Sequence, residues 1–404
     1  MTFPVRPSKP GALCHVDSKG RVWRPDGSIH HSRRFRALTD DPPLRWAPAG
    51  AQAIVRHAQV VGAKWDSGVL MRATAWGKDG AEVLAARITA MAQDADVAAV
   101  AAPARLGWDT WSRTWEGPRM ASPRPRVARW LTARMIGGRA DWAEHTASEA
   151  VWETDRNMSY LASAALLPAG TAVPVGPDHS MPAMVADCEV TLPAGLILSP
   201  ITVRGDARAE HPLEGTWRTT LWTPEIEDAI SAGCKVKILD GWGWSLAPLG
   251  KRWGETMFAL RTGGHEVAKI AAVAAIGAHG SQVRREVSED EAPLATPLRA
   301  DTMTALVETG EVKPSVHPEW YGWILASARS ELYRRTMSIM QCGHTVHATD
   351  FDGVFFSGGP ERCHCRDSHS GLGEWKSRFI GSAEFPASRW VVGDNIRKTP
   401  GLRT

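Results

Sequence analysis

Three aspartates in two separate segments have the residue type and setting for metal-dependent chemistry. Asp350 and Asp352 belong to an Asp-Phe-Asp-Gly sequence between two apolar arms, a pattern that predicts a β-hairpin with acids at its tip. Asp155 follows the strand-like segment Ala150 to Thr154 and precedes a helical pattern, Met158 to Leu167. Two ordinary alternatives stay open, an Asp-rich turn for the first segment and a helix N-cap for Asp155.

Considered together, the two segments favour phosphoryl transfer. This chemistry commonly uses two divalent ions about 4 Å apart, which carboxylates from separate strands hold in place. A lysine in the Ala-rich segment Lys269 to Gly277 adds a group that can neutralise triphosphate charge. The alternative is a buried Ala-rich helix whose lysine extends its ammonium group to solvent.

The composition is that of a globular protein and leaves the partner open. The chain has 404 residues, of which 43% are hydrophobic, and a formal net charge of +3. A net charge this small neither requires nor excludes a nucleic acid. No apolar run approaches the roughly 18 residues of a membrane span, and no apolar stretch of a secretion signal follows Met1. The sequence therefore predicts a cytoplasmic protein without membrane association.

A group of cysteines and histidines between residues 342 and 365 offers softer metal ligands. Cys342, His344 and the Cys363-His364-Cys365 sequence could bind zinc, although their spacing matches no familiar zinc finger. The six cysteines of the chain are scattered, which argues against a disulfide framework.

The remaining pattern alternates helices with strands and predicts an α/β (α+β) fold. Expected helices are Gly80 to Ala92, Thr223 to a stop at Gly233, Gly254 to Arg261, His265 to Ile276 and Trp320 to Met340. Strands are expected at 188–203 and from Lys235 to Leu239. The Gly263-Gly264 turn suggests that the third and fourth helices form an antiparallel pair.

In order and spacing these segments resemble the palm and fingers of family B DNA polymerases, and especially the protein-primed branch of phages and linear plasmids. The resemblance covers roughly residues 131 to 392. Motif A of the family, Asp-x-x-Ser-Leu-Tyr-Pro, is matched by Asp155 and Tyr160 at the same spacing. Motif C, Asp-Thr-Asp followed by Ser or Gly, is matched by Asp350-Phe351-Asp352-Gly353.

Motif B of the family, Lys-x-x-x-Asn-Ser-x-Tyr-Gly, is matched only at its ends, by Lys269 and Gly277. Val273, Ala274 and Ile276 stand where the family has Asn, Ser and Tyr. The phosphate contact is therefore kept, whereas the side chains that pack around the nascent base pair differ.

Two flanking segments extend the resemblance toward DNA contacts. The stretch from Met135 to Arg139 resembles the aromatic-x-Gly-Gly segment before the palm, and Gly371 to Lys376 resembles the entry to the primer-gripping Lys-x-Tyr segment. The DNA-binding residues that the resemblance implies are Gly137, Gly138, Arg139, Lys376, Arg389 and Trp390.

The resemblance implies a right-hand polymerase fold with an antiparallel-sheet palm, a short helical fingers pair and a small thumb. The implied domains are an N-terminal domain of unassigned role at 1–128, the palm at 129–250 and 283–360, the fingers at 251–282 and a thumb-like segment at 361–404. Asp155, Asp350 and Asp352 would bind Mg²⁺, or Mn²⁺ in its place. The residues implied to contact the incoming nucleotide are Tyr160, Asn157, Lys269, Arg261 and Gly277.

Tyr160 would lie under the sugar and exclude a 2′-hydroxyl, and its alternative role is packing in the core of the palm. The implied partners are primer-template DNA and dNTPs, with a terminal or replication protein as a further candidate. Because residues 1 to 130 lack the Asp-x-Glu motif of the family's exonuclease, the sequence predicts a polymerase without proofreading, in the replication of a phage, plasmid or mobile element. Two alternatives stay open: a primase-like or template-independent nucleotidyltransferase, and a degenerate polymerase that only binds DNA.

Overall fold

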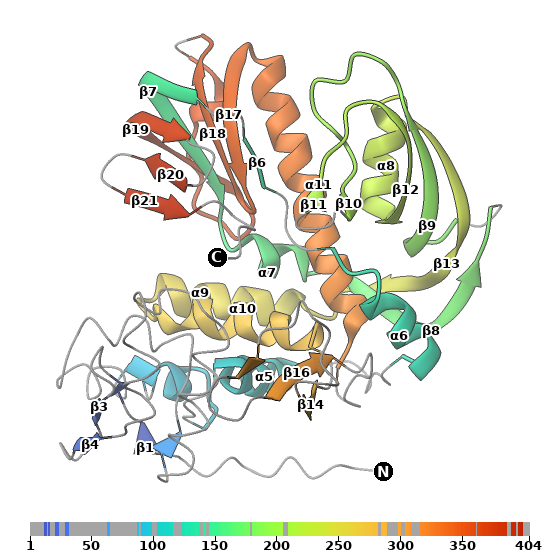
Figure 1. Cartoon of the computed structure of the whole chain (residues 1–404). Helices are drawn as coiled ribbons and strands as arrows, with labels where there is room; N and C mark the ends of the chain where they lie inside the picture. The colour runs from blue at the N-terminus through green and yellow to red at the C-terminus, as the bar shows by residue number, and fades with distance from the viewer. Residues whose placement is uncertain are drawn as a thin grey trace. The chain divides into compact units, whose positions relative to one another are not determined.

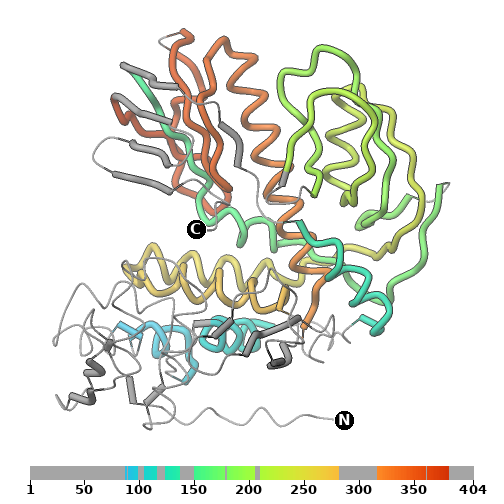
Figure 2. Tube along the Cα trace, in the orientation of Figure 1, coloured from blue at the N-terminus to red at the C-terminus, as the bar shows by residue number. Residues whose placement is uncertain are grey.

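The computed structural model divides the chain into two compact units, one of residues 1–117 and 252–278 and one of 118–251 and 279–404. It describes residues 87–88, 90–98, 103–115, 123–136, 140–142, 145–177, 180–204, 209–281, 284–288, 298–299, 304–308, 316–360, 362–385, 389–392 and 395–398, together with short strands before residue 65 (Figure 2). None of the described helices is long and apolar enough to cross a membrane.

The second unit is built on a seven-stranded sheet of order β21-β20-β19-β7-β18-β17-β6 (Figure 1). Its strands are β6 (Ala140–Trp142), β7 (His145–Arg156), β17 (His344–Asp350), β18 (Gly353–Gly358), β19 (Trp375–Phe385), β20 (Arg389–Val392) and β21 (Asn395–Lys398). Each neighbouring pair in this sheet is antiparallel. The expected thumb-like segment thus contributes strands to the sheet that also holds Asp155.

A four-stranded antiparallel sheet of order β12-β9-β13-β8 forms the other half of this unit. Its strands are β8 (Leu167–Val175), β9 (Ala183–Leu192), β12 (Gly215–Trp222) and β13 (Lys235–Ala247), and the smaller strands of the unit are β10 (Val203–Arg204), β11 (Ala209–Glu210), β14 (Arg284–Ser288), β15 (Leu298–Arg299) and β16 (Thr304–Glu308). Helix α8 (Thr223–Ser231) packs on this sheet, and Ile226 and Ala229 join Val190 and Leu221 in its core.

Helix α11 (Pro318–Gln341) connects the two halves, because it contacts β17 and β18 of the larger sheet as well as α8, β8 and β12 (Figure 1). Leu332 and Ile339 pack with Val354 and Phe356 of β18 in one buried cluster. Two shorter helices, α6 (Pro125–Thr132) and α7 (Ser159–Ser163), contact the same long helix.

The first unit is described mainly through helices. These are residues 87–88 and 90–94, α5 (Pro103–Thr114), α9 (Lys251–Thr262) and α10 (Val267–His279), and its short strands are β1 (Ala12–Leu13), β2 (His15–Val16), β3 (Arg21–Trp23), β4 (Ile29–His31) and β5 (Ala63–Lys64). Gly107 of α5 lies so close to α10 that an added Cβ would stand 2.3 Å from the Ala271 carbonyl oxygen. Its own carbonyl accepts a hydrogen bond from Trp253 Nε1 at 3.2 Å, so the two predicted fingers helices fold together with a segment that precedes the predicted palm.

Most of the expected elements are present. The predicted mixture of helices and antiparallel strands is confirmed, as are the helix from Thr223, the two helices around Gly263-Gly264 and the long helix after residue 318. The helix predicted from Met158 to Leu167 is wrong beyond Ser163, because strand β8 begins at Leu167. Pro168 disfavours the helical conformation of Leu167, so the helix could not have continued through that residue.

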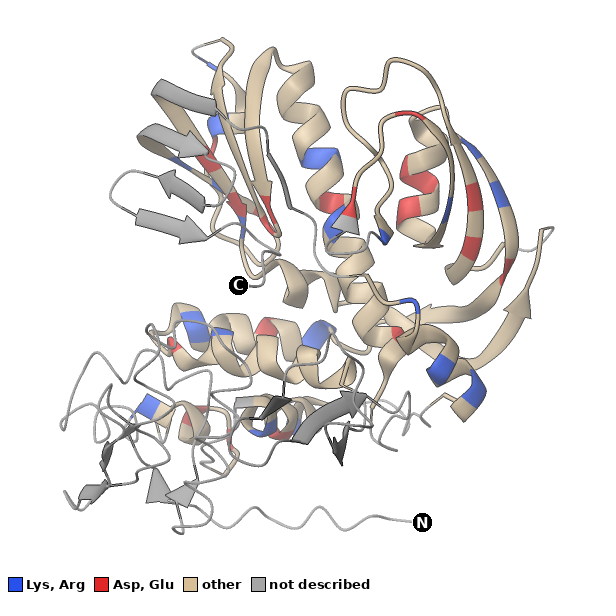
Figure 3. Cartoon of the chain, in the orientation of Figure 1, with Lys and Arg blue, Asp and Glu red and all other residues tan. Residues whose placement is uncertain are grey.

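A buried ion pair joins α8 to α11. Arg329 Nε donates to Glu225 Oε1 at 2.8 Å, and the side chains of the two residues are only 5% and 4% exposed. Arg329 Nη1 also donates to the Ile136 carbonyl at 2.9 Å, while Glu225 Oε2 accepts from the Trp222 backbone N–H at 3.2 Å. Figure 3 shows acidic residues on α8 and basic residues on α11, and this pair is the buried member of that set. Satisfied on both sides, the pair fixes how α11 lies against the smaller sheet.

Arg329→Ala is expected to destabilise the second unit by about 3–5 kcal/mol, since it leaves the Glu225 carboxylate buried without its cation. Arg218→Ala is the matched control, because the Arg218–Glu189 pair is 77% and 35% exposed and such pairs contribute at most about 1 kcal/mol. Urea unfolding followed by tryptophan fluorescence measures both changes. Equal shifts of the two midpoints would contradict the role given to the buried pair.

Candidate active site

The three predicted acids lie at one end of the larger sheet, Asp350 at the end of β17, Asp352 in the turn before β18 and Asp155 near the end of β7. In the sheet register Asp350 of β17 is opposite Gly353 of β18, and Gly353 is opposite Asp155 of β7. On the far side of β7, Asp155 is opposite Lys376 of β19. The chain therefore brings together two acidic segments almost 200 residues apart in sequence, with one strand between them.

The hairpin tip is tightly closed and tied to the strand that carries Asp155. The Asp352 backbone N–H donates to the Asp350 carbonyl, which closes a three-residue turn, and Phe351 takes a left-handed φ of 50° at its centre. A left-handed conformation is strained for a bulky residue and often marks a functional site. The Asp352 carbonyl in turn accepts from the Arg156 backbone N–H at 2.8 Å, so the position of the tip is fixed relative to Asp155.

Asp155 does not cap the helix that follows it. The N-cap of α7 is Met158, whose φ of 46° is left-handed and whose side chain makes no capping hydrogen bond. The Asp155 carboxylate instead accepts from Lys376 Nζ at 2.8 Å, with side-chain exposures of 25% and 48%. A half-exposed pair of this kind contributes little to stability, so it leaves the carboxylate available to a stronger cation.

A loop before β19 is held against the segment after Asp155. Asn157 donates its backbone N–H to the Glu374 carbonyl at 2.9 Å and its side-chain Nδ2 to the His369 carbonyl at 3.3 Å. The Asn157 carbonyl accepts from the Gly373 N–H at 2.9 Å, and Arg156 Nε donates to the Gly373 carbonyl at 3.0 Å. The Asn157 amide, predicted to contact a nucleotide, thus holds the 369–374 loop in this structure.

Tyr160 of α7 lies within the electrostatic reach of the hairpin acids. Burial raises the pKa of its phenol, the negative charge of Asp352 raises it further, and Tyr321 and Asp350 add smaller increases that Arg329 partly opposes. The phenol is therefore kept neutral and close to two of the three predicted metal ligands. The role predicted for Tyr160 at the sugar of a nucleotide stays a prediction.

The three acids fit a magnesium site in donor type. Mg²⁺ prefers carboxylate oxygens, and a two-ion site draws them from separate strands. Among the described residues, however, the donors that lie within 4.8 Å of one another belong to Cys342, Cys363, His364 and Cys365, and no carboxylate is in that group. Binding of magnesium at Asp155 would therefore require this carboxylate to share or exchange its contact with Lys376.

The other predicted site residues are distributed over both units. Lys269 and Gly277 lie in α10 and Arg261 lies in α9, where Lys269 and Arg261 are half-buried and Gly277 is exposed. The structure places these three residues in a different unit from the acids.

The remaining DNA-contact predictions stay predictions. Gly137, Gly138 and Arg139 lie outside the described residues. Arg389 and Trp390 begin β20, opposite Lys398 and Arg397 of β21, and only their backbone is described.

Sequence reasoning missed two features of the site. The Lys376–Asp155 contact depends on the β7–β19 register, for which the sequence carries no local signal. Glu153, two residues before Asp155, is buried and its Oε2 accepts from Arg378 Nε at 2.6 Å. A charged residue inside an apolar strand was the available signal, because buried carboxylates are normally paired.

Comparisons by sequence identify no relative: no family model matches the chain, and no curated protein matches it. The fold is similar to solved structures of Phi29 DNA polymerase. The complex of that polymerase with single-stranded DNA aligns with a TM-score of 0.60 at 16% identity, over 80% of this chain and 61% of the polymerase. The ternary complex with primer-template DNA and incoming nucleotides aligns with a TM-score of 0.59 at 15% identity, over 81% and 61%. The likeness is one of fold, and the chain spans less than two thirds of the polymerase's length.

The raised pKa of Tyr160 predicts a pH dependence of stability. Because the folded-state pKa lies above the unfolded value of about 10, the free energy of unfolding should fall as pH rises above about 10. Tyr160→Phe should make this alkaline fall smaller, and Tyr321→Phe should do so independently, since burial also raises the pKa of Tyr321. Urea unfolding at about pH 8 and about pH 11 measures the difference, and an unchanged alkaline loss in Tyr160→Phe would contradict the placement of this phenol.

Proposed function

We propose that the chain is a template-directed DNA polymerase that transfers nucleotides to a primer 3′-hydroxyl without proofreading, in the replication of a phage, plasmid or mobile element. The observation that carries the proposal is the row formed by Asp350, Gly353 and Asp155 across β17, β18 and β7. The fold likeness to Phi29 DNA polymerase supports it, because the matching structures include complexes with primer-template DNA and nucleotides. The order of the acids in the sequence is also the order of motifs A and C in the family that the sequence resembles.

Asp155, Asp352 and Asp350 would hold magnesium, or manganese in its place, which would activate the primer hydroxyl and neutralise charge on the triphosphate. Asp155 and Asp352 are the principal ligands in this proposal, and Asp350 supports them. The strand register and the closed hairpin turn would keep the acids in place before substrate arrives, so little reorganisation would be needed at the moment of reaction.

Other side chains would position the nucleotide and the DNA. Lys269 of α10 would neutralise phosphate charge, and Arg261 of α9 is a second, less favoured candidate for the same role. Gly277, also in α10, would contact the nucleotide as well. Tyr160 would pack against the sugar, close to the Asp352 carboxylate. Lys376 would exchange its contact with Asp155 for one with DNA phosphate when the metal binds.

The Gly-Gly-Arg segment at 137–139 and the Arg389-Trp390 pair would contact the DNA backbone, as the resemblance of their sequence positions suggests. A terminal or replication protein is a further proposed partner. The alternatives of a primase-like transferase and of a DNA-binding protein without activity predict different outcomes in the two experiments that follow.

Asp155→Asn and Asp352→Asn should each reduce primer extension by at least about three orders of magnitude, because a neutral amide oxygen is a much weaker magnesium ligand than a charged carboxylate. DNA affinity should change little, since these acids would bind the metal ions and make few contacts with the DNA backbone. Asp240→Asn is the matched control, an exposed aspartate in the smaller sheet. Extension of a labelled primer-template with dNTPs and magnesium measures the loss, and full activity of either site variant would refute the site.

Tyr160→Val should relax the choice of sugar. Removal of the ring should raise ribonucleotide use relative to deoxynucleotide use by roughly tenfold or more, which is about 1.4 kcal/mol in differential transition-state binding. Tyr160→Phe is the control, because it keeps the ring and should keep the selectivity. Competition between rNTPs and dNTPs in single-nucleotide extension measures the ratio.

A folded Tyr160→Val variant with unchanged selectivity would contradict contact between this ring and the sugar. Circular dichroism and the thermal midpoint of each variant separate that outcome from a loss of core packing. A wild-type protein that prefers rNTPs and starts synthesis on single-stranded DNA without a primer would favour the primase-like alternative.

A further inference from the structure

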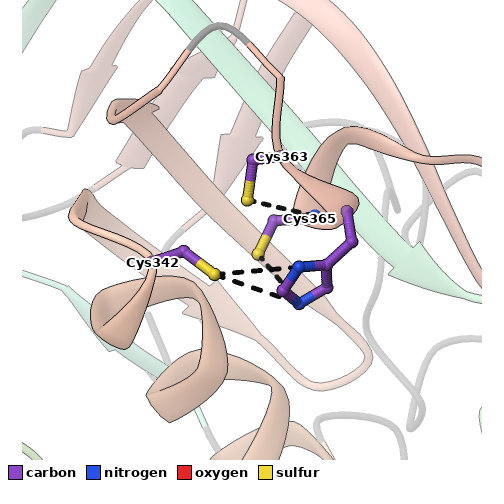
Figure 4. Close-up of side chains that lie close together, drawn as sticks. Cys342, Cys363 and Cys365 are labelled. Carbon is purple, nitrogen blue, oxygen red and sulfur yellow. Dashed lines mark hydrogen bonds between the residues drawn. The ribbon is translucent and has the colours of Figure 1, made fainter.

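A second group of metal-ligating side chains lies at the other end of the β17–β18 hairpin. One donor atom each from Cys342, Cys363, His364 and Cys365 lies within 4.8 Å of all the others (Figure 4). Cys342 Sγ is 3.9 Å from both ring nitrogens of His364, and Cys365 Sγ is 3.8 Å from His364 Nε2. The proposed polymerase chemistry uses none of these residues.

These separations are close to those of a tetrahedral zinc site. Zinc–sulfur bonds of about 2.3 Å and zinc–nitrogen bonds of about 2.0 Å put neighbouring ligand atoms about 3.5–3.8 Å apart. Three thiols and one imidazole form a common structural zinc set. Soft thiolate ligands also select zinc over the magnesium that carboxylates prefer.

The four donors come from two segments that the fold brings together. Cys342 is the C-cap of α11, and the 3₁₀ turn η2 (His364–Arg366) follows Cys363 in the chain. Cys365 is fully buried in the cluster formed by α11 and β18, and Cys342 and Cys363 pack against the same cluster. All three thiols are free, so disulfide bonds do not account for their proximity.

The surroundings supply the contacts that orient thiolate ligands. Cys363 Sγ accepts from the Cys365 backbone N–H at 3.4 Å, and the Cys365 carbonyl accepts from Arg335 Nη2 at 3.1 Å and from Ser377 Oγ at 2.9 Å. Three thiolates and one Zn²⁺ carry a net charge of −1. The guanidinium of Arg335, which interacts electrostatically with all three cysteines, compensates that charge.

His344 lies next to the group and is the other histidine near these thiols. Its Nδ1 bonds to the Gly358 carbonyl at 2.6 Å, whereas its Nε2 is buried and makes no hydrogen bond of standard geometry. The imidazole lies beside Cys363. The buried nitrogen thus faces one of the four proposed ligands and belongs to the immediate surroundings of the group.

We propose that Cys342, Cys363, Cys365 and His364 bind one structural Zn²⁺ ion. The ion would join the C-terminal end of α11 to the turn that begins the segment leading to β19. That segment contains the 369–374 loop bonded to Asn157 and ends at Lys376, which pairs with Asp155. Zinc would therefore fix the start of a segment whose other end lies against the predicted acids.

The test uses the full chain purified without chelator from zinc-supplemented cells. Elemental analysis should find one zinc per chain, and Cys342→Ala and Cys363→Ala should lose it. Cys342 and Cys363 are chosen because they are only half-buried. Cys365→Ala would remove a fully buried core side chain, so a loss of zinc in that variant would not be separable from a loss of folding. Cys234→Ala is the control, a buried free cysteine of the smaller sheet's core, and should retain the zinc.

Replacement of zinc by cobalt reports the ligands directly. The wild type should show the visible bands of tetrahedral Co²⁺ and a near-ultraviolet thiolate-to-cobalt band, which Cys342→Ala should weaken. A strong chelator should lower the thermal midpoint of the wild type and leave that of Cys342→Ala unchanged.

Purified wild type without stoichiometric zinc, or zinc that survives both cysteine substitutions, would overturn the site. A His364→Asn variant that keeps zinc while His344→Asn loses it would overturn the choice of His364 as the fourth ligand. Because elemental analysis and cobalt spectra require no catalysis, their outcome is independent of the proposed polymerase activity.

Discussion

The register of β17, β18, β7 and β19 is the constraint on which the candidate site depends. Successive residues of a strand face opposite sides, so a slip of one residue would turn the Asp155 side chain to the other face of the sheet. Hydrophobic alternation cannot fix this register, because Val354, Phe355 and Phe356 of β18 are all fully buried. The closed turn at Asp350 to Asp352 and the bond from the Arg156 N–H to the Asp352 carbonyl fix it instead.

Buried charges stabilise the layers around that sheet. Glu153 on β7 pairs with Arg378 on β19, and Glu225 on α8 pairs with Arg329 on α11. Each of these carboxylates would cost several kcal/mol if it were left alone in the interior, so each pair specifies which elements must be neighbours. Arg329 also lowers the pKa of Tyr160, which links the interhelix pair to the site electrostatically.

Local sequence signals predicted the elements well and the contacts between them poorly. Capping residues and glycine stops located the helix from Thr223 and the pair around Gly263-Gly264, because those signals act within one turn of the chain. The end of α7 was misjudged, since the effect of Pro168 competes with good helix formers before it. The types and order of the acids suggested that they cooperate, and in the sheet Asp350 and Asp155 lie on strands with only β18 between them.

Contacts between distant segments could not be predicted in this way. The Asn157 amide matched a sequence position associated with nucleotide contact, yet it holds a loop more than 200 residues away in the chain. The same limit applies to the cysteines, since Cys342 and Cys363 are separated by a whole hairpin and fit no familiar spacing. The pairing of β17 with β18 returns the chain to the end of α11, and this brings Cys363, His364 and Cys365 close to Cys342.

The β17–β18 hairpin has carboxylate oxygens at one end and thiol sulfurs near the other, and its length keeps these two kinds of metal ligand apart. Carboxylates lie at its tip, where Asp350 is opposite Gly353, and thiols lie beyond its base, where His344 is opposite Gly358. Six residue steps of about 3.3 Å put these ends about 20 Å apart, so ions at the two sites would not compete for the same ligands. Oxygen donors at one end favour magnesium and sulfur donors at the other favour zinc. A zinc ion at the base would therefore hold the hairpin through ligands that the proposed magnesium site at the tip does not use.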